Sequence, residues 1–210
     1  MAGIHYYRDL GTLATWVKAL LAVQLVLALL AALAAWTHGR GYSSETGSDF
    51  YALIALLQAI TYVIGGILAL RWIYLACANS HAFGAQGLGV KPLMAVVWYF
   101  VPIASLVMPF KAMSETWKVA RSHGGDWEAE RTPLLLIGWW AAWLIGNIAG
   151  LVALRLSFQG LEGEAAAETI TPIADLISAV AIALFLVIVA RITTMQRETA
   201  KAASLAPLMR

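Results

Sequence analysis

The polar side chains that could do chemistry are few, and they lie in or beside long apolar stretches. Gln24, Gln58 and Asn147 stand near the middle of such stretches. A side-chain amide in hydrocarbon needs a protein partner because lipid offers none. We therefore expect these three residues to form a polar core of hydrogen bonds between helices, with a polar pathway for a small solute as the alternative.

Two carboxylates, Asp175 and Glu115, are candidate ionisable sites. Asp175 falls in the first turn of the last predicted helix, where a negative charge interacts favourably with the helix dipole. If its side chain faces a cavity, Asp175 becomes a candidate site for a proton or a cation. Glu115 shares one helical face with Lys111 and Lys118, at spacings of four and seven residues.

The sequence offers no set of residues for catalysis or for metal binding. Its four histidines fall outside the predicted membrane spans, and the single cysteine, Cys77, cannot form an internal disulfide. No H-E-x-x-H motif, C-x-x-C motif or carboxylate pair lies in a span. Because no nucleophile, base and orienting group can be assembled, we expect a protein without enzymatic activity, metal or cofactor.

The composition indicates the solvent in which the chain folds. Of the 210 residues, 61% are hydrophobic and 12% are charged. Soluble domains have about 25% charged residues, so the composition predicts an all-α, polytopic membrane bundle. The net charge of +2 is too small to indicate a nucleic-acid partner. Nine tryptophans fit aromatic belts at the two membrane interfaces; lipid or pigment contacts would use the same residues, and the sequence does not distinguish them.

Long apolar runs predict how the chain crosses the bilayer. A hydrocarbon core about 30 Å thick needs about 20 apolar residues in a helix. We predict a single transmembrane domain over residues 1–210, with Pro172 opening the last span. The predicted spans are about 19–36, 50–70, 134–154 and 172–190.

The apolar segment 92–110 is interrupted by Pro102 and Pro109. Each proline removes a backbone donor and clashes with the preceding turn. Broken helix at membrane depth survives only where protein or water satisfies the freed backbone groups. We predict a re-entrant or interfacial hairpin here, with a fifth, kinked span as the alternative.

Positive charge favours the four-span arrangement. Without a crossing at 92–110, twelve of the fourteen lysines and arginines lie on one side, and Arg40 and Arg155 lie on the other. A fifth span would give a split of nine to five. The positive-inside rule therefore favours four spans with both termini in the cytoplasm. A basic amphipathic helix at 111–121 is expected on the inner face, with Met113 and Trp117 among the lipid head groups.

Glycines mark one face of the third predicted span. Gly138, Gly146 and Gly150 lie on nearly the same side of that helix. Small residues let two helices approach closely in a membrane. The face is interpreted either as packing within the chain or as docking of another transmembrane helix. Besides membrane lipids, the expected partners are therefore other transmembrane subunits or a second copy of the chain.

A pattern of tryptophans and prolines occupies the middle of the chain. It consists of Arg71, Trp72, Asn79, Pro92, Trp98, Pro102, Pro109 and Trp117. This pattern resembles the DUF4328 family of bacterial membrane proteins of unknown function over roughly residues 52–154. Between Pro102 and Pro109, this sequence has Ser105 at the position where that family usually has an asparagine. The resemblance implies the bacterial inner membrane and supplies no activity.

Two functions follow from these observations. Short loops, glycine faces and the absence of charges from the middle of the spans indicate a structural or accessory subunit of a larger membrane complex. The alternative is a transporter or channel for a small solute or ion that uses the proline-broken segment beside Arg71 and Asn79. Discontinuous helices form the binding sites of many transporters.

Overall fold

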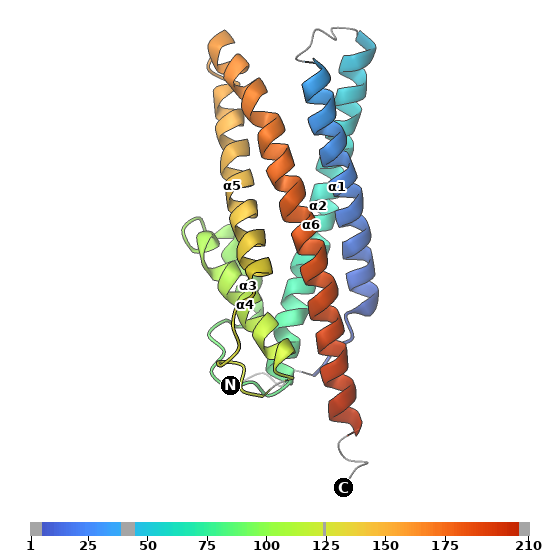
Figure 1. The fold of residues 1–210 in the computed structure, drawn as a ribbon, viewed down its shortest axis with the longest axis vertical. Helices are drawn as coiled ribbons and strands as arrows, with labels where there is room; N and C mark the ends of the chain where they lie inside the picture. The colour runs from blue at the N-terminus through green and yellow to red at the C-terminus, as the bar shows by residue number, and fades with distance from the viewer. Residues whose placement is uncertain (1–5, 39–44, 124, 206–210) are drawn as a thin grey trace. The chain divides into compact units, whose positions relative to one another are not determined.

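The computed structural model describes residues 6–38, 45–123 and 125–205, and their regular structure is entirely helical. This confirms the predicted all-α class (Figure 1). Arg40 and Arg210 of the charge count lie outside the described residues. The helices are α1 (Gly11–His38), α2 (Glu45–Ala82), α3 (Pro92–Val97), α4 (Met108–Arg121), α5 (Leu134–Leu156) and α6 (Leu161–Leu205), with short 3-10 turns η1 (Trp98–Phe100) and η2 (Ala104–Leu106).

Four of the described helices are long and apolar enough to cross a membrane. These segments are Gly11–Leu33, Ala52–Ala82, Leu134–Leu156 and Leu161–Ser204. At 1.5 Å per residue, the 38 residues of α2 and the 45 residues of α6 span about 57 Å and about 68 Å. Both lengths exceed a hydrocarbon core of about 30 Å, so each helix must extend beyond it.

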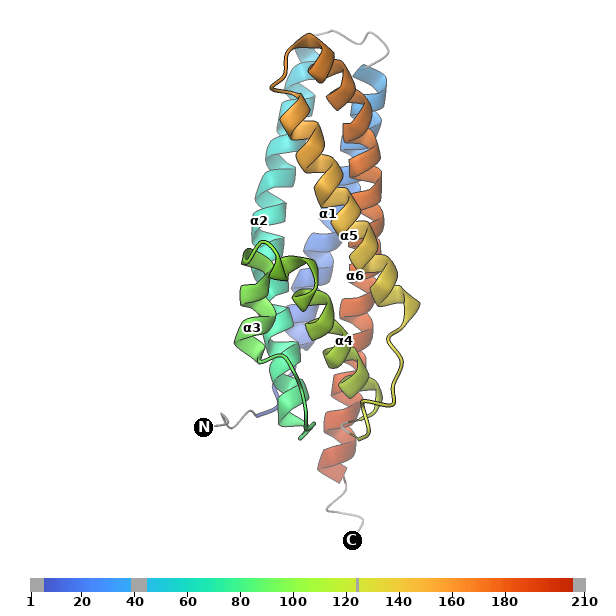
Figure 2. The ribbon, with the colours of Figure 1, turned by 90° about the vertical axis from the view of Figure 1, so that its left-hand side faces the viewer.

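The proline-containing segment forms a broken hairpin and not a fifth long helix. The chain passes through α3, η1 and η2 into α4, and α3 and α4 lie side by side where the chain reverses (Figure 2). Pro92 and Pro109 stand in the first turns of α3 and α4, where a missing N–H costs no helical bond. Pro102 lies between the two 3-10 turns.

The last helix begins earlier than expected. It starts at Leu161, and Pro172 lies inside it, so the prediction that Pro172 opens this helix is wrong. Glu162 and Glu164 stand in the first turn, where their negative charges interact favourably with the helix dipole. A run of alanines, which favour helix, follows them. As a consequence, Asp175 lies in the helix interior and not in its first turn.

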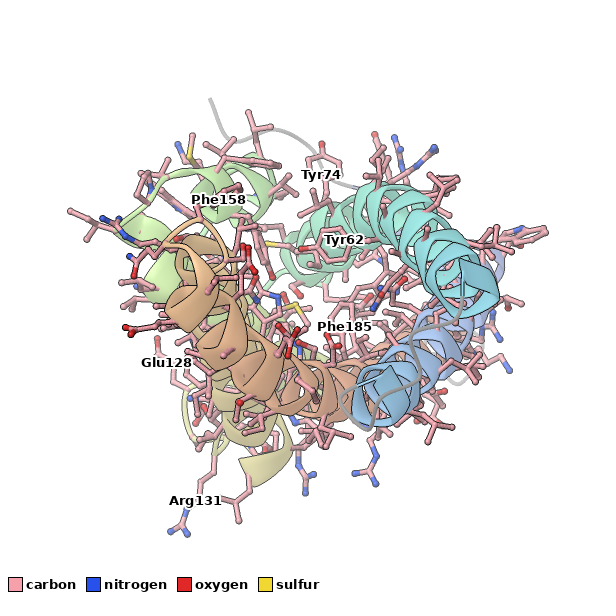
Figure 3. The ribbon with its side chains drawn as sticks, turned by 90° about the horizontal axis from the view of Figure 1, so that it is seen from above. Tyr62, Tyr74, Glu128, Arg131, Phe158 and Phe185 are labelled. Carbon is pink, nitrogen blue, oxygen red and sulfur yellow. The ribbon has the colours of Figure 1, made fainter. Side chains whose placement is uncertain are left out.

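The chain forms two compact units. Unit 1 consists of Met1–Lys18, Gly66–Ile137 and Val187–Arg210, and unit 2 consists of Ala19–Gly65 and Gly138–Leu186. Unit 1 has twelve basic and six acidic residues, hence a formal charge of +6; unit 2 has two basic and six acidic residues, hence −4. The twelve basic residues that the sequence assigned to one side are the twelve in unit 1. One of them, Arg131, is exposed and points outward (Figure 3).

The apolar face of α4 belongs to the core of unit 1. Met113 and Trp117 are 1% and 2% exposed, and Val119 is fully buried. The expectation that Met113 and Trp117 lie among lipid head groups is therefore wrong. Burial within the protein takes the same apolar surface out of water without any contact with lipid.

Candidate functional site

The core of unit 1 joins α2 to the end of α6 through Trp72. This side chain is completely buried, and its Nε1–H donates to Oγ1 of Thr193 at 3.1 Å. A buried indole needs an acceptor for its single donor, and Thr193 is itself 9% exposed. The bond therefore fixes one contact between two helices that are 121 residues apart in sequence.

Asn79 fastens the N-terminal segment to the same two helices. Its Oδ1 accepts the backbone N–H of Arg8 at 2.9 Å, and its Nδ2 donates to the carbonyl of Arg8 at 2.9 Å. The same Nδ2 group donates to Oε1 of Gln196 at 3.0 Å. Gln196 in turn donates from Nε2 to the carbonyl of Ala76 at 2.8 Å. Asn79 and Gln196 are each 1% exposed, so protein groups replace water around both amides.

The connection between α2 and α3 is held from both sides at Val90. Its carbonyl accepts from Nε2 of His81 at 3.1 Å and from the Cys77 thiol at 3.6 Å. Its N–H donates to Oε2 of Glu115 at 3.2 Å, and Oε1 of Glu115 lies 4.0 Å from Nζ of Lys111. The Glu115 carboxylate, 9% exposed, therefore holds a loop in place.

The remaining positions of the tryptophan and proline pattern also belong to unit 1. Pro92, Pro109 and Trp117 are buried, Trp98 is half-buried, and Arg71 and Pro102 are exposed. The Ser105 hydroxyl donates to the carbonyl of Pro102 at 2.7 Å and so closes the turn between the prolines. The buried members of this pattern belong to the core of unit 1.

Sequence reasoning missed the partners of this network on α6. The predicted span ends near residue 190 and so leaves Thr193 and Gln196 outside it. A helical period continued past that point would have placed Gln196 on one face with Ile188 and Ile192, all three of which are buried. The sequence could not predict that Arg8 lies beside Asn79. Arg8 makes both hydrogen bonds through its backbone N–H and carbonyl, which every residue except proline has.

In unit 2, the predicted polar core forms at one place. Gln24 is 8% exposed, and its Oε1 accepts from Oγ1 of Thr61 at 2.5 Å. Gln58 is half-buried, and its backbone carbonyl lies 3.1 Å from the same hydroxyl oxygen. Asn147, in contrast, is exposed and donates at 2.7 Å to the carbonyl of Trp143 in its own helix.

Helices α5 and α6 run antiparallel and side by side in unit 2 (Figures 1 and 2). At Gly146 the two helices approach closely, because a Cβ atom added there would lie 2.9 Å from Oγ of Ser178. A Cβ atom at Gly138 would lie 3.7 Å from Cδ1 of Leu184, whereas one at Gly150 would meet nothing within 4 Å. The glycine face of α5 is thus occupied by α6 at Gly146 and opens towards Gly150.

The seam between α5 and α6 contains a cavity of about 290 Å³ that is open to the surface, and Gly150, Leu154 and Ser157 in its wall are exposed. Asp175, which is half-buried, lies in its wall. The lining residues are Gly150, Ala153, Leu154, Ser157, Ala167, Thr171, Ala174 and Asp175.

A groove of about 530 Å³ lies in unit 1 between the start of α1 and the end of α6. Its charged residues are Asp9, Lys18 and Arg197, and Nη2 of Arg197 lies 3.1 Å from Oδ1 of Asp9. The backbone N–H of Gly11, which donates to Asp9 at 3.1 Å, and the Arg197 guanidinium both hold the pKa of the Asp9 carboxyl below its usual value. This ion pair is exposed to solvent and lies at the surface of the groove.

A comparison with protein families assigns the chain. A family model described as a domain of unknown function, DUF4328, matches residues 40–194, so the chain belongs to this family. No curated protein and no solved structure matches the chain. Among the described residues, no three His, Cys, Asp or Glu side chains lie close enough together to hold a metal ion.

Proposed function

We propose that the protein is a non-catalytic structural or accessory subunit of a larger complex in the bacterial inner membrane, with unit 1 and both termini in the cytoplasm. The observation that carries this proposal is the exposure of α2. Within the apolar 18-residue window of α2, only 6% of the residues are buried in the chain, against 22–33% in the windows of the other three candidate spans. This apolar part of α2 therefore has most of its surface available to lipid or to a partner.

One face of α2 suits a partner helix better than lipid. Ala52, Ala55 and Ala59 are exposed and follow one another at spacings of three and four residues, so they share a face. Long aliphatic side chains, among them Leu57 and Ile60, occupy another exposed face. Transmembrane helices associate through close packing at small residues, since lipid provides no hydrophobic force between them.

The chain itself illustrates this use of small residues. On α5, Gly146 and Ala153 stand seven residues apart and face α6, and Gly146 approaches Ser178 closely. We assign the alanine face of α2 to a transmembrane helix of a different protein. The formal charge of +6 on unit 1 supports its cytoplasmic placement through the positive-inside rule.

Position-specific cross-linking tests this proposal. Cys77 is 4% exposed, so a cysteine introduced at the surface is the reactive thiol. Ala55→Cys is expected to cross-link to one stoichiometric partner in native membranes, and mass spectrometry of the band identifies that partner. Leu57→Cys, on the aliphatic face, is the matched control and is expected to remain uncross-linked.

Three outcomes contradict the accessory role. Equal cross-linking from both positions would mean random contact in the membrane. A band containing two copies of this chain would mean self-association. A lone protein in mild detergent, without any cross-link from Ala55→Cys, would leave α2 facing lipid alone.

Transport of a small solute or ion is the second candidate function, and the broken hairpin of α3, η1, η2 and α4 favours it. The side chains of Asn79 and Glu115, however, are engaged by protein partners. Glu115→Gln keeps the size and an acceptor oxygen while removing the charge. Loss of ion flux from proteoliposomes, with the unfolding temperature unchanged, would support transport; absence of flux through the unaltered protein would exclude it for the ions tested.

A further inference from the structure

The cavity in unit 2 exists because small side chains face one another across the α5–α6 seam. Gly150 and Ala153 line it from α5, and Ala167 and Ala174 line it from α6. At Gly146 the two helices are in close contact, whereas at Gly150 an added Cβ atom would meet nothing within 4 Å. The seam therefore widens from a tight contact into a space of about 290 Å³.

Asp175 gives this space a charge. It lies inside a candidate membrane span, where a carboxylate is costly unless a partner or water meets it. Within the part of the chain that the structure describes, no hydrogen bond or ion pair meets this carboxylate. No basic residue lines the cavity either.

The other polar groups in the wall present acceptors. Thr171 stands one turn before Asp175 on the same face of α6, and its hydroxyl donates to the carbonyl of Ala167 at 2.8 Å. The Ser157 hydroxyl likewise donates to the carbonyl of Leu154 at 2.8 Å. Each hydroxyl has its single proton committed to backbone, so its oxygen is left to accept. The cavity thus combines one carboxylate and two hydroxyl oxygens with apolar walls.

We propose that this cavity binds a small organic ammonium ion, with the ammonium group on Asp175 and Thr171 and the apolar body against Gly150 and Ala153. A single carboxylate matches a single positive charge, and an ammonium group supplies the donors that the wall lacks. A volume of 290 Å³ is many times the roughly 30 Å³ of one water molecule, so it admits an organic body. Calcium, by contrast, takes about six to eight oxygen ligands. This binding site is independent of the accessory role proposed above.

Benzylammonium and its uncharged counterpart benzyl alcohol are suitable probes for the purified full-length protein in detergent. Benzylammonium is expected to raise the unfolding temperature in a concentration-dependent manner and to give a saturable calorimetric signal, and benzyl alcohol is not. Asp175→Asn is expected to weaken binding by about tenfold or more, because it removes the negative charge that pairs with the ammonium group. The matched control, Glu168→Gln, removes an exposed acid of the same helix and is expected to bind as the unaltered protein does.

A second variant tests the cavity without changing the charge. Ala153 is 5% exposed and lines the cavity, so Ala153→Leu fills part of the space while Asp175 is retained. It is expected to weaken benzylammonium binding even if Asp175→Asn fails to fold. Equal binding by the unaltered protein and Ala153→Leu would overturn the proposal. Equal binding of the charged and uncharged probes, or none of either, would overturn it too.

Discussion

Asn79 and Gln196 bind each other through their side-chain amides at 3.0 Å, although 117 residues separate them in sequence. Both are 1% exposed, and each also bonds a backbone group, Arg8 in one case and Ala76 in the other. The pair therefore links the N-terminal segment, α2 and α6 at one point in unit 1. It serves the fold, because both amides form their hydrogen bonds with protein groups.

Replacing Asn79 by alanine is expected to destabilise the protein. The change leaves both backbone groups of Arg8 and Oε1 of Gln196 without the partner that they have now. A buried polar group left unsatisfied costs about 1–3 kcal/mol, so we expect a loss of about 2 kcal/mol or more. For a chain of this size that loss lowers the unfolding temperature by about 4–8 °C. Thermal unfolding in detergent measures it.

Asn147→Ala is the control for this experiment. Asn147 is exposed and bonds only its own helix, at the carbonyl of Trp143. Surface changes of this kind usually stay within about 0.5 kcal/mol. Equal destabilisation by the two alanine variants would contradict the role assigned to Asn79.

Trp72→Phe tests the hydrogen bond between α2 and α6. Phenylalanine retains most of the buried apolar surface but cannot donate to Oγ1 of Thr193, which now accepts at 3.1 Å. We expect a loss of about 1–2 kcal/mol in the free energy of unfolding. Adding Thr193→Val to Trp72→Phe should cost less than the sum of the two single changes, as expected for residues in contact. Strict additivity would show that the bond contributes nothing.

The sequence predicted the helical class, the four apolar spans and the break at 92–110 because each rests on a local property. A span is a run of apolar residues, and the break follows from the steric effect of Pro102 and Pro109. The full length of α6 could not be read in this way. A hydropathy profile falls at Arg191, whereas Ile192 and Gln196 remain helical because they are buried within unit 1.

The candidate sites were harder to predict than the fold. The sequence singled out Asn79 and Trp72 but not Gln196 or Thr193, since nothing local pairs residues more than 100 positions apart. An aspartate in a predicted membrane span marked Asp175 as a candidate site, but the sequence could not show that it lines a cavity. The cavity lies where α5 and α6 are no longer in close contact, beyond Gly146. The position of that point is set by the three-dimensional packing of the two helices.

Lowering the pH is expected to remove the contribution of Asp9. Because the Gly11 N–H and Arg197 lower its pKa in the folded state, the folded pKa lies below the unfolded value of about 3.9. The stabilisation is therefore complete above the unfolded pKa and is lost as the pH falls through the folded pKa. Unfolding temperatures measured from pH 6 to pH 3 should show a small advantage of the unaltered protein over Asp9→Asn that decreases towards the acidic end. The advantage is small because the ion pair is exposed to solvent. A difference that does not change with pH would contradict this assignment.

The contact between Gly146 and Ser178 makes the two glycines of α5 unequal. Gly146→Ala places a Cβ atom 2.9 Å from Oγ of Ser178, whereas Gly150→Ala places one in open space. We expect the first change to cost about 1 kcal/mol through overpacking, and the second to be neutral or stabilising by up to about 1 kcal/mol because alanine favours helix. Ser178→Ala removes the clashing oxygen and should restore much of the stability of Gly146→Ala, which a double-mutant cycle measures. If both glycine variants unfold at the same temperature and Ser178→Ala rescues neither, α6 does not cover Gly146. The glycine face of α5 would then be open to another transmembrane helix.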